Sequence, residues 1–340
     1  MDPFLQEGPR ASSRFGADRT YRHALERTLP EDVFEEVAPR LDDLGERVAG
    51  ELRALADQAE RNPPRHVPYD AWARRVDRID VDPAWLTLVD AGAREGIVAT
   101  AYEDAFDKHA PVVQFGTIDL WNTSSATAGC PLSMSDAAAR VLLNEDEELA
   151  RRYVPKLTAR DDYWTSGQWM TEKEGGSDVG RTGTIARRHG DGTWTLHGTK
   201  WFTSATTADM ALALARPDGA GDGSKNLSLY ALELRAPDGS WNGITVRRLK
   251  DKLGTKALPT AELDLDGTLA VPVGGDGRGV AKVTPMLNIT RVWAAFGSLS
   301  AIGGGLTLAR DYARTREAFG RLLKDLPAHR SWIARVAAEY

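Results

Sequence analysis

Two short clusters decide the fold of this chain: Met170-Thr-Glu-Lys-Glu-Gly-Gly-Ser-Asp-Val179 and Lys200-Trp-Phe-Thr-Ser204. The first places hydroxyls beside two adjacent glycines, whose backbone can approach a planar polar ligand closely. The second places two aromatic rings beside two hydroxyls, which suits stacking on a ring and hydrogen bonding to its edge. Thr193 to Gly198, between them, alternates like a strand. The pair therefore predicts two walls of one ligand site on a sheet.

Composition is that of a globular enzyme subunit. The chain has 340 residues, with 42% hydrophobic and 27% charged residues and a single cysteine. One cysteine excludes a disulfide framework and favours a reducing compartment, so we expect a cytoplasmic protein. Cys130 has no histidine nearby in sequence, and we expect it to serve packing. Residues 1–8 show no basic segment followed by an apolar run, which argues against a secretory signal.

Charge is distributed unevenly along the chain. The formal net charge is −6, yet residues 281–340 hold nine Lys or Arg against four Asp or Glu. A basic end could indicate nucleic-acid binding. We favour a simpler interpretation, in which a few arginines serve a phosphorylated cofactor and the others lie on a solvated helix face. The acidic remainder argues against DNA binding by most of this chain.

Periodicity separates three regions. Up to about Asp162 the pattern is helical, and an apolar residue recurs every three or four positions from Phe34 to Leu55, with a kink or break expected at Pro39. From about Tyr163 to Asp276 the period is two, and the predicted strands are residues 193–198, 210–215, 227–234 and 261–265. No helix separates these strands, so we expect an antiparallel, barrel-like sheet. Residues 274–279, rich in glycine, mark its end.

The last region returns to helix. Residues 281–316 form one helical segment, and the eighteen residues from Val292 to Ala309 carry no charge, which reaches the length of a membrane span. Their many glycines and serines instead favour close helix–helix contact in a subunit interface, and Gly303 to Gly305 are interpreted as packing residues. Arg330 to Tyr340 resembles the start of another amphipathic helix. Because a helix pair without the rest of its bundle exposes a large apolar patch, we expect this chain to be part of a longer protein.

The two clusters resemble the flavin-binding wall of the acyl-CoA dehydrogenase family. That family has Thr-Glu-Pro-x-x-Gly-Ser-Asp, a strand, and then Gly-x-Lys-x-Trp-x-Thr. Here Lys173, Phe202 and Ser204 replace the proline, tryptophan and threonine, as in the AidB-like (adaptive-response flavoprotein) branch. Further agreement with this branch is found at Asn62 to Pro64, Tyr69 to Ala71, Arg74 to Asp77, Pro83 to Trp85, Cys130-Pro131, Arg248-Leu-Lys-Asp-Lys-Leu-Gly254 and Pro327.

The resemblance implies an α+β fold and bound FAD. It predicts an N-terminal α-helical domain at residues 1–162, a central antiparallel β-barrel domain at 163–280, and the beginning of a C-terminal helical bundle at 281–340. In the full-length protein, that bundle would form the core of a homotetramer. We expect no membrane partner. A Rossmann motif, metal-ligand spacing and a nucleophile elbow are not found in the sequence, which argues against those classes.

The resemblance also implies the cofactor-binding residues. Residues 168–177 would run along the flavin, and Phe202 to Ser204 would form the opposite rim, with Ser204 near the reactive N5 atom. Arg316 and Phe319, in Arg316-Glu-Ala-Phe-Gly320, would reach the flavin nucleotide of a neighbouring subunit. An arginine suits this role because its guanidinium can bond two phosphate oxygens at once. The complete predicted set is Gln168, Trp169, Met170, Thr171, Gly176, Ser177, Phe202, Thr203, Ser204, Arg316 and Phe319.

Two functions remain open at this stage. The first is α,β-dehydrogenation of an acyl thioester such as acyl-CoA, in which a carboxylate removes an α-proton. The catalytic base stays unknown, because the position used by one group of family members, just before Arg291, is occupied here by Thr290. The second is a flavoprotein with a mainly binding role, either DNA protection or acyl-chain sequestration. Nucleic-acid binding would then require a C-terminal region beyond this chain.

Overall fold

The computed structural model describes residues 6–340, which form two compact units. The first unit contains the described residues up to Ala56, Glu103–Ser125 and Trp293–Tyr340; the second contains Asp57–Tyr102 and Ala126–Val292. The units interleave in sequence, and the three consecutive domains predicted above remain a prediction. Most of residues 1–8, where the sequence argues against a secretory signal, lies outside the described residues.

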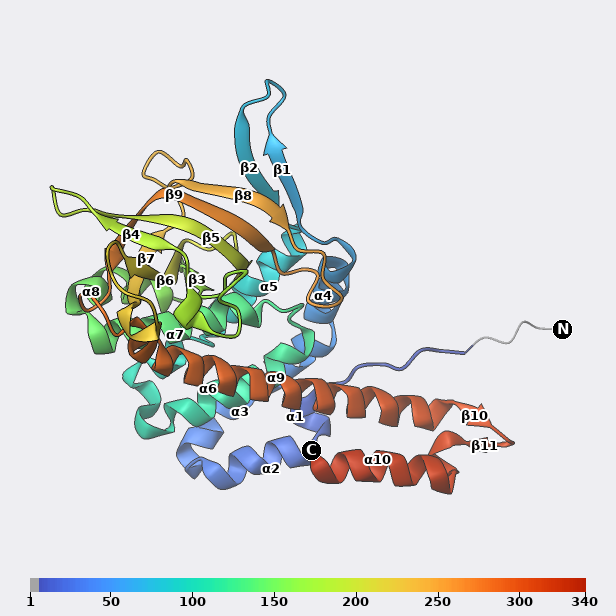
Figure 1. The fold of residues 1–340 in the computed structure, drawn as a ribbon. Coiled ribbons are helices and arrows are strands. Elements are labelled where there is room, and N and C mark those ends of the chain that lie inside the picture. The colour runs from blue at the N-terminus through green and yellow to red at the C-terminus, as the bar shows by residue number, and fades with distance from the viewer. Residues whose placement is uncertain (1–5) are drawn as a thin grey trace. The chain divides into compact units, whose positions relative to one another are not determined.

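The first unit is almost entirely helical (Figure 1). Its elements are α1 (Arg14–Ala17), α2 (Arg19–Thr28), α3 (Glu31–Ala49), the start of α4 (Glu51–Arg61), η2 (Asp104–His109), α6 (Ala110–Trp121), η3 (Asn122–Ser124), most of α9 (Gly279–Thr315), the strands β10 (Glu317–Ala318) and β11 (Arg321–Leu322), η6 (Leu323–Asp325) and α10 (Pro327–Glu339). Of the kink or break expected at Pro39, the break is not found. Pro39 lies inside α3, and the chain breaks at Gly50, whose φ/ψ of −110°/−97° are not helical.

Ion pairing and close helix contact hold the first unit together. Arg14 is buried, and it pairs with Asp119 at 3.1 Å. A Cβ atom at Gly303 would lie 2.4 Å from the Arg14 guanidinium, and one at Gly304 would lie 2.6 Å from Thr123. These two glycines therefore serve packing, as predicted from their place in the apolar helix.

The second unit contains the barrel and its covering helices. Its strands are β1 (Arg65–Tyr69), β2 (Arg75–Asp80), β3 (Ser166–Trp169), β4 (Ile185–Arg188), β5 (Trp194–Ser204), β6 (Met210–Pro217), β7 (Ser228–Glu233), β8 (Ile244–Leu249) and β9 (Thr260–Pro272). Its helices are α5 (Pro83–Arg94), η1 (Ala99–Ala101), α7 (Gly129–Glu145), α8 (Glu147–Leu157), η4 (Val179–Arg181) and η5 (Ser224–Asn226), with the end of α4 and the start of α9.

The barrel closes because β7 pairs with both β9 and β6. The order β6–β4–β5–β9–β7 returns to β6, since β7 also pairs with β6, while β3 pairs with β6 and β8 with β9. The predicted antiparallel character is correct for most of these pairs, but β3 and β4 each run parallel to β6. The closing contacts are short, since β4 pairs with β6 and β7 with β9 over two residue pairs each.

Helices cover the barrel through one shared apolar core. Buried residues of α7 and α8 pack with those of β6 and β7 and with the first turns of α9, where Val283 and Met286 are buried. The larger apolar residues of β6 alternate with alanine, and the strand is buried on both faces along almost its entire length.

The hairpin β1–β2 lies in the region that was predicted to be helical (Figure 1). Its strands are short, and Pro68 interrupts the register between Val67 and Tyr69. Trp72, in the connecting turn, is 80% exposed. The hairpin also contacts the barrel, since Arg75 donates to the carbonyl of Val246 in β8 at 2.8 Å.

Candidate functional site

The two clusters identified in the sequence lie side by side. The backbone N–H of Trp201 in β5 donates to the carbonyl oxygen of Thr171 at 2.9 Å. Thr171 follows β3 by two residues, so the first cluster leaves the sheet at the point where the second cluster passes. The structure therefore brings together two segments separated by about thirty residues of sequence, as the sequence analysis required.

A buried ion pair fastens the clusters to each other. The Lys200 ammonium is fully buried and lies 2.6 Å from Glu172 Oε1, and it also donates to the carbonyl of Leu214 at 2.7 Å. Glu172 accepts two further close hydrogen bonds, from the Gly183 N–H at 2.7 Å and from the Thr184 hydroxyl at 2.6 Å.

The two partners of this pair respond differently to burial. Burial lowers the pKa of Lys200 and outweighs the opposing effect of Glu172. Burial alone would raise the pKa of Glu172, but Lys200, Thr184 and Gly183 together hold it below its ordinary value. The carboxylate is therefore ionised and fully engaged, which makes it a structural anchor rather than a proton acceptor.

A β-bulge directs the second cluster outward. Lys200 pairs with Leu263 of β9, whereas Thr203 pairs with Ala261, so β5 contains one extra residue here. The extra residue reverses the alternation of faces. Lys200 and Thr203 consequently point into the barrel, while the Phe202 side chain is 50% exposed and Ser204 is half-buried.

The exposed predicted residues lie on the two segments that the Trp201–Thr171 hydrogen bond joins. Thr171 is half-buried and Gly176 and Ser177 are exposed, on the segment that passes beside β5. In the described part of the chain, the hydroxyls of Thr171 and Ser177 and the backbone N–H groups of residues 173–177 have no protein acceptor. Unengaged hydroxyl and N–H donors beside an exposed aromatic ring are suited to hold an anionic, planar ligand.

Other predicted residues are buried. Trp169 is fully buried in β3, Met170 is part of the apolar core, and Gln168 is half-buried. Thr203 donates its hydroxyl to the carbonyl of Ala261 at 2.7 Å, so only its backbone remains for a ligand. We conclude that these residues shape the wall from behind.

Arg316 and Phe319 belong to the first unit. Phe319 is 96% exposed in the turn of the β10–β11 hairpin, with a φ of 53°. A phenylalanine rarely adopts this left-handed conformation, and its exposure removes any packing benefit within the described chain. Arg316 is half-buried and donates to the Gln6 side chain at 3.3 Å.

The segment from Arg248 to Gly254 supplies contacts that the sequence analysis did not assign. The Lys250 ammonium lies 3.5 Å from the centre of the Trp201 ring and 4.4 Å from that of Phe202. It pairs at 2.7 Å with Glu262, which also pairs with Arg248. Lys252, two residues later, donates to Thr260, and the Thr260 hydroxyl lies 3.1 Å from that of Ser204. The Arg248–Gly254 motif was visible in the sequence. Only the pairing of β8 and β5 with β9 shows that it lies beside the second cluster.

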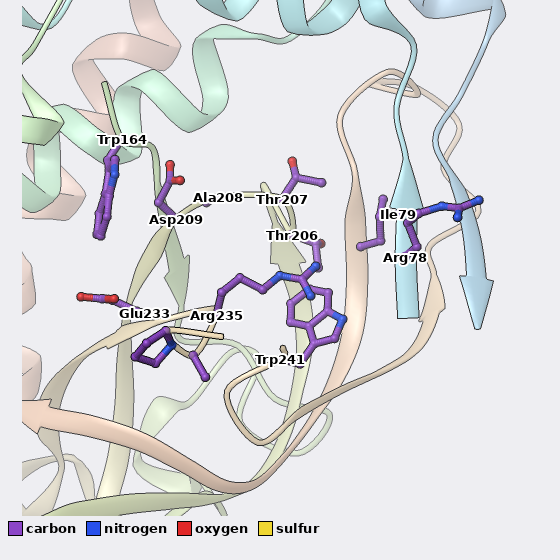
Figure 2. A pocket seen from close by; sticks show the side chains of 12 residues that line it. Arg78, Ile79, Trp164, Thr206, Thr207, Ala208, Asp209, Glu233, Arg235 and Trp241 are labelled. Atoms are coloured by element: carbon purple, nitrogen blue, oxygen red, sulfur yellow. The ribbon is translucent and has the colours of Figure 1, made fainter. Parts of the chain in front are cut away.

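A cavity of about 320 Å³ opens just after the second cluster (Figure 2). Asp209, Glu233 and Trp164 lie on one side of it, and Arg235 extends across it to Trp241, whose ring centre is 3.6 Å from the guanidinium carbon. The lining includes none of the predicted cofactor residues. This cavity is therefore distinct from the wall described above.

In α9, no residue from Gly279 to Arg310 is identified as a catalytic base. The Thr290 hydroxyl donates within its own helix, to the carbonyls of Met286 at 3.1 Å and Leu287 at 3.2 Å. From Gly279 to Arg310, α9 contains no Asp or Glu. The expectation that Thr290 cannot replace a carboxylate thus agrees with its hydrogen bonding.

Family models match most of the chain. Residues 9–163 match the family model of the adaptive response protein AidB N-terminal domain; residues 167–268 match the acyl-CoA dehydrogenase middle domain, and residues 275–340 its C-terminal domain. The chain is 42% identical, over 99% of its length, to acyl-CoA dehydrogenase family member 11 of Caenorhabditis elegans. It is 31% identical, over 88% of its length, to the putative acyl-CoA dehydrogenase AidB of Escherichia coli.

A solved structure is similar along the whole of this chain. The crystal structure of Caenorhabditis elegans ACDH-11 in complex with C11-CoA superposes with a TM-score of 0.97 and 41% identity, covering all of this chain and 59% of that one. The chain spans 56% of the length of each of the two curated relatives named above. The predicted architecture, with a helical N-terminal region, a central barrel and a helical C-terminal region, is confirmed.

Proposed function

This chain belongs to the acyl-CoA dehydrogenase family, whose members are FAD-dependent oxidoreductases, and we propose that it binds FAD along the wall formed by its two clusters. The observation that supports this proposal is the joining of Thr171 to Trp201 beside an outward-facing Phe202 and Ser204.

The residues present fit the cofactor. A flavin requires an aromatic or apolar surface for its ring, donors along the ring edge, and donors for its pyrophosphate. Phe202 offers a half-exposed ring, Thr171 and Ser204 offer hydroxyls, and residues 173–177 offer unengaged N–H groups. The Lys200–Glu172 pair is fully satisfied within the protein, so it brings no competing unpaired charge to the wall.

The proposed activity is α,β-dehydrogenation of an acyl thioester, for which bound FAD supplies the hydride acceptor. The residues of this chain would hold and orient it: the N–H groups of 173–177 favour anionic groups, and the Ser204 hydroxyl donates to the ring edge. Donors in that position stabilise an electron-rich reduced flavin. We propose acyl-CoA as the substrate class, since the similar ACDH-11 structure holds C11-CoA.

Flavin titration tests the proposal. FAD added to the purified chain is expected to bind with quenching or a shift of its fluorescence, and a Thr171→Ala plus Ser204→Ala variant is expected to bind it more weakly. Thr207→Ala, which removes an exposed hydroxyl three residues beyond Ser204, is the matched control and should behave as the unmodified chain. Absence of binding by the unmodified chain, or equal binding by all three proteins, would overturn the assignment.

Acyl-CoA oxidation is tested separately on the flavin-loaded protein. Anaerobic addition of acyl-CoAs of increasing chain length should bleach the oxidised flavin if the chain carries out the reaction. Binding without bleaching would favour the second candidate, a flavoprotein with a mainly binding role. That candidate is supported by the lack of any carboxylate from Gly279 to Arg310.

We also propose that the full-length protein is a cytoplasmic homotetramer and that Phe319 of this chain contacts a second copy. Support comes from the 96% exposure of Phe319 and from exposed apolar side chains at Ile302, Trp332 and Val336. The helix α9 is also long and apolar enough to cross a membrane, and 22% of its most apolar stretch is buried. One such helix is weak evidence for a membrane protein. Sedimentation of the unmodified chain and of Phe319→Ser tests whether the β10–β11 hairpin forms a subunit interface. If it does, self-association should weaken in the variant.

A further inference from the structure

The strongest unassigned feature of the second unit is a hydrogen-bond chain that ends at Ser204. The Lys252 ammonium lies 3.0 Å from the Thr260 hydroxyl oxygen and 2.8 Å from the carbonyl oxygen of Leu258. The Thr260 hydroxyl in turn lies 3.1 Å from that of Ser204. Ser204 and Thr260 are direct cross-strand partners of β5 and β9, so the sheet register fixes their contact.

The Lys252 ammonium sets the direction of these hydrogen bonds. An ammonium donates and never accepts, so the Thr260 oxygen must accept from Lys252. Thr260 is 3% exposed, and the Ser204 oxygen is the one acceptor that the described residues offer to its hydroxyl proton. Thr260 therefore donates to Ser204. The Ser204 proton is then free to point away from the sheet.

The Lys252 ammonium, where this series of hydrogen bonds begins, has no ion-pair partner among the described residues. Lys250 is paired with Glu262, but among the described residues no carboxylate lies within ion-pair distance of Lys252, whose other contact is a backbone carbonyl. Lys252 is only half-buried, which limits the desolvation cost of keeping it charged. Burial lowers the pKa of Lys252, and the nearby Cys130 and Glu60 oppose this effect. A cation without an ion-pair partner at one end of a series of hydrogen bonds polarises each hydroxyl in it, which makes the last one a better donor.

We propose that Lys252 is a positioning residue for the cofactor wall: acting through Thr260, its ammonium orients and polarises the Ser204 hydroxyl as a donor to the flavin ring edge. This inference rests on the proposed binding of FAD. It also gives a role to the Arg248–Gly254 segment, in which Lys250 packs on the rings of Trp201 and Phe202 and Lys252 acts on the Ser204 hydroxyl through Thr260.

Three substitutions test the chain of contacts. Lys252→Met removes the donor, Thr260→Val removes the intermediate hydroxyl without altering charge, and Lys252→Arg retains a charged donor. The first two should each weaken FAD binding about fivefold, which corresponds to the loss of one hydrogen bond. They should also lower the reduction potential of bound flavin, because the Ser204 hydroxyl becomes a weaker donor to the reduced form. Lys252→Arg should restore most of both properties.

Lys256→Met is the matched control. Lys256 lines the same small cavity of about 140 Å³ as Lys252, but it is exposed and makes no hydrogen bond among the described residues. Its substitution removes one positive charge from the same loop, so a general electrostatic effect would appear in both variants. We expect flavin affinity and potential to stay unchanged in Lys256→Met.

A double substitution with Ser204 tests whether Lys252 acts on flavin affinity and potential through the Thr260–Ser204 contact. In a Ser204→Ala background, Lys252→Met should cause no further change in affinity or potential. An undiminished effect in that background, or equal behaviour of Lys252→Met and Lys256→Met, would overturn the inference while leaving FAD binding intact. Failure of the unmodified chain to bind FAD would instead overturn the proposed function and this inference together.

Discussion

Substitution of Lys200 by methionine should destabilise the barrel strongly. The variant keeps the apolar stem but removes the ammonium, so Glu172 stays in place with Gly183 and Thr184 as its remaining close donors. Breaking a buried pair by removing one partner typically costs about 3–5 kcal/mol, because a buried charge is left uncompensated. The full burial of Lys200 places the expected loss in that range.

A double-mutant cycle separates this cause from a general packing defect. Lys200→Met combined with Glu172→Gln leaves no buried charge, so the double variant should be more stable than Lys200→Met alone. Lys225→Met removes an exposed lysine of the same unit and should change stability by less than about 0.5 kcal/mol. Urea unfolding followed by far-ultraviolet circular dichroism gives the free energies. Purely additive effects of the two substitutions, or a loss below about 1 kcal/mol for Lys200→Met, would refute the reasoning.

Further predictions concern packing, reactivity and pH. Gly304→Ala should lower the thermal midpoint, because its Cβ would lie 2.6 Å from Thr123, whereas Gly305→Ala, with no atom within 4 Å, should raise it through helix propensity. Cys130 should resist iodoacetamide at pH 8 until the chain unfolds, since burial raises its pKa to about 11. The pKa of Glu172 is lowered, so its contribution to stability should be complete above the ordinary glutamate pKa and be lost as the pH falls further; Glu172→Gln should flatten acid unfolding in that range.

Much of the architecture could be predicted from the sequence, since local patterns carry it. The alternation from Met210 to Ala215 and the charge-free run from Val292 to Ala309 led directly to β6 and α9. The β1–β2 hairpin was missed because its strands are short and interrupted by Pro68. The parallel pairing of β3 and β4 with β6 was missed because it depends on contacts between distant segments.

The contacts of the candidate site are less accessible to sequence reasoning. The residue types in the two clusters identified the wall, yet nothing local indicates that Glu172 is anchored by Lys200, twenty-eight residues away. Likewise, Lys252 and Ser204 are connected by hydrogen bonds through Thr260, which lies on a third segment. A motif reports which side chains are available, whereas the register of β5 against β9 determines which of them meet.

The bulge in β5 is the feature that allows one strand to serve two purposes. In a regular strand, Lys200, Phe202 and Ser204 would share a face, because side chains alternate with a period of two. Either the lysine would then be exposed and lose its buried partner, or the aromatic ring and the hydroxyl would be buried away from any ligand. The extra residue between Lys200 and Thr203 removes this conflict, since it places the anchoring cation inside the barrel and the ligand-facing groups outside. Because the ion pair holds the bulged segment against Thr171, we infer that the stability of the barrel and the geometry of the cofactor wall depend on the same few residues.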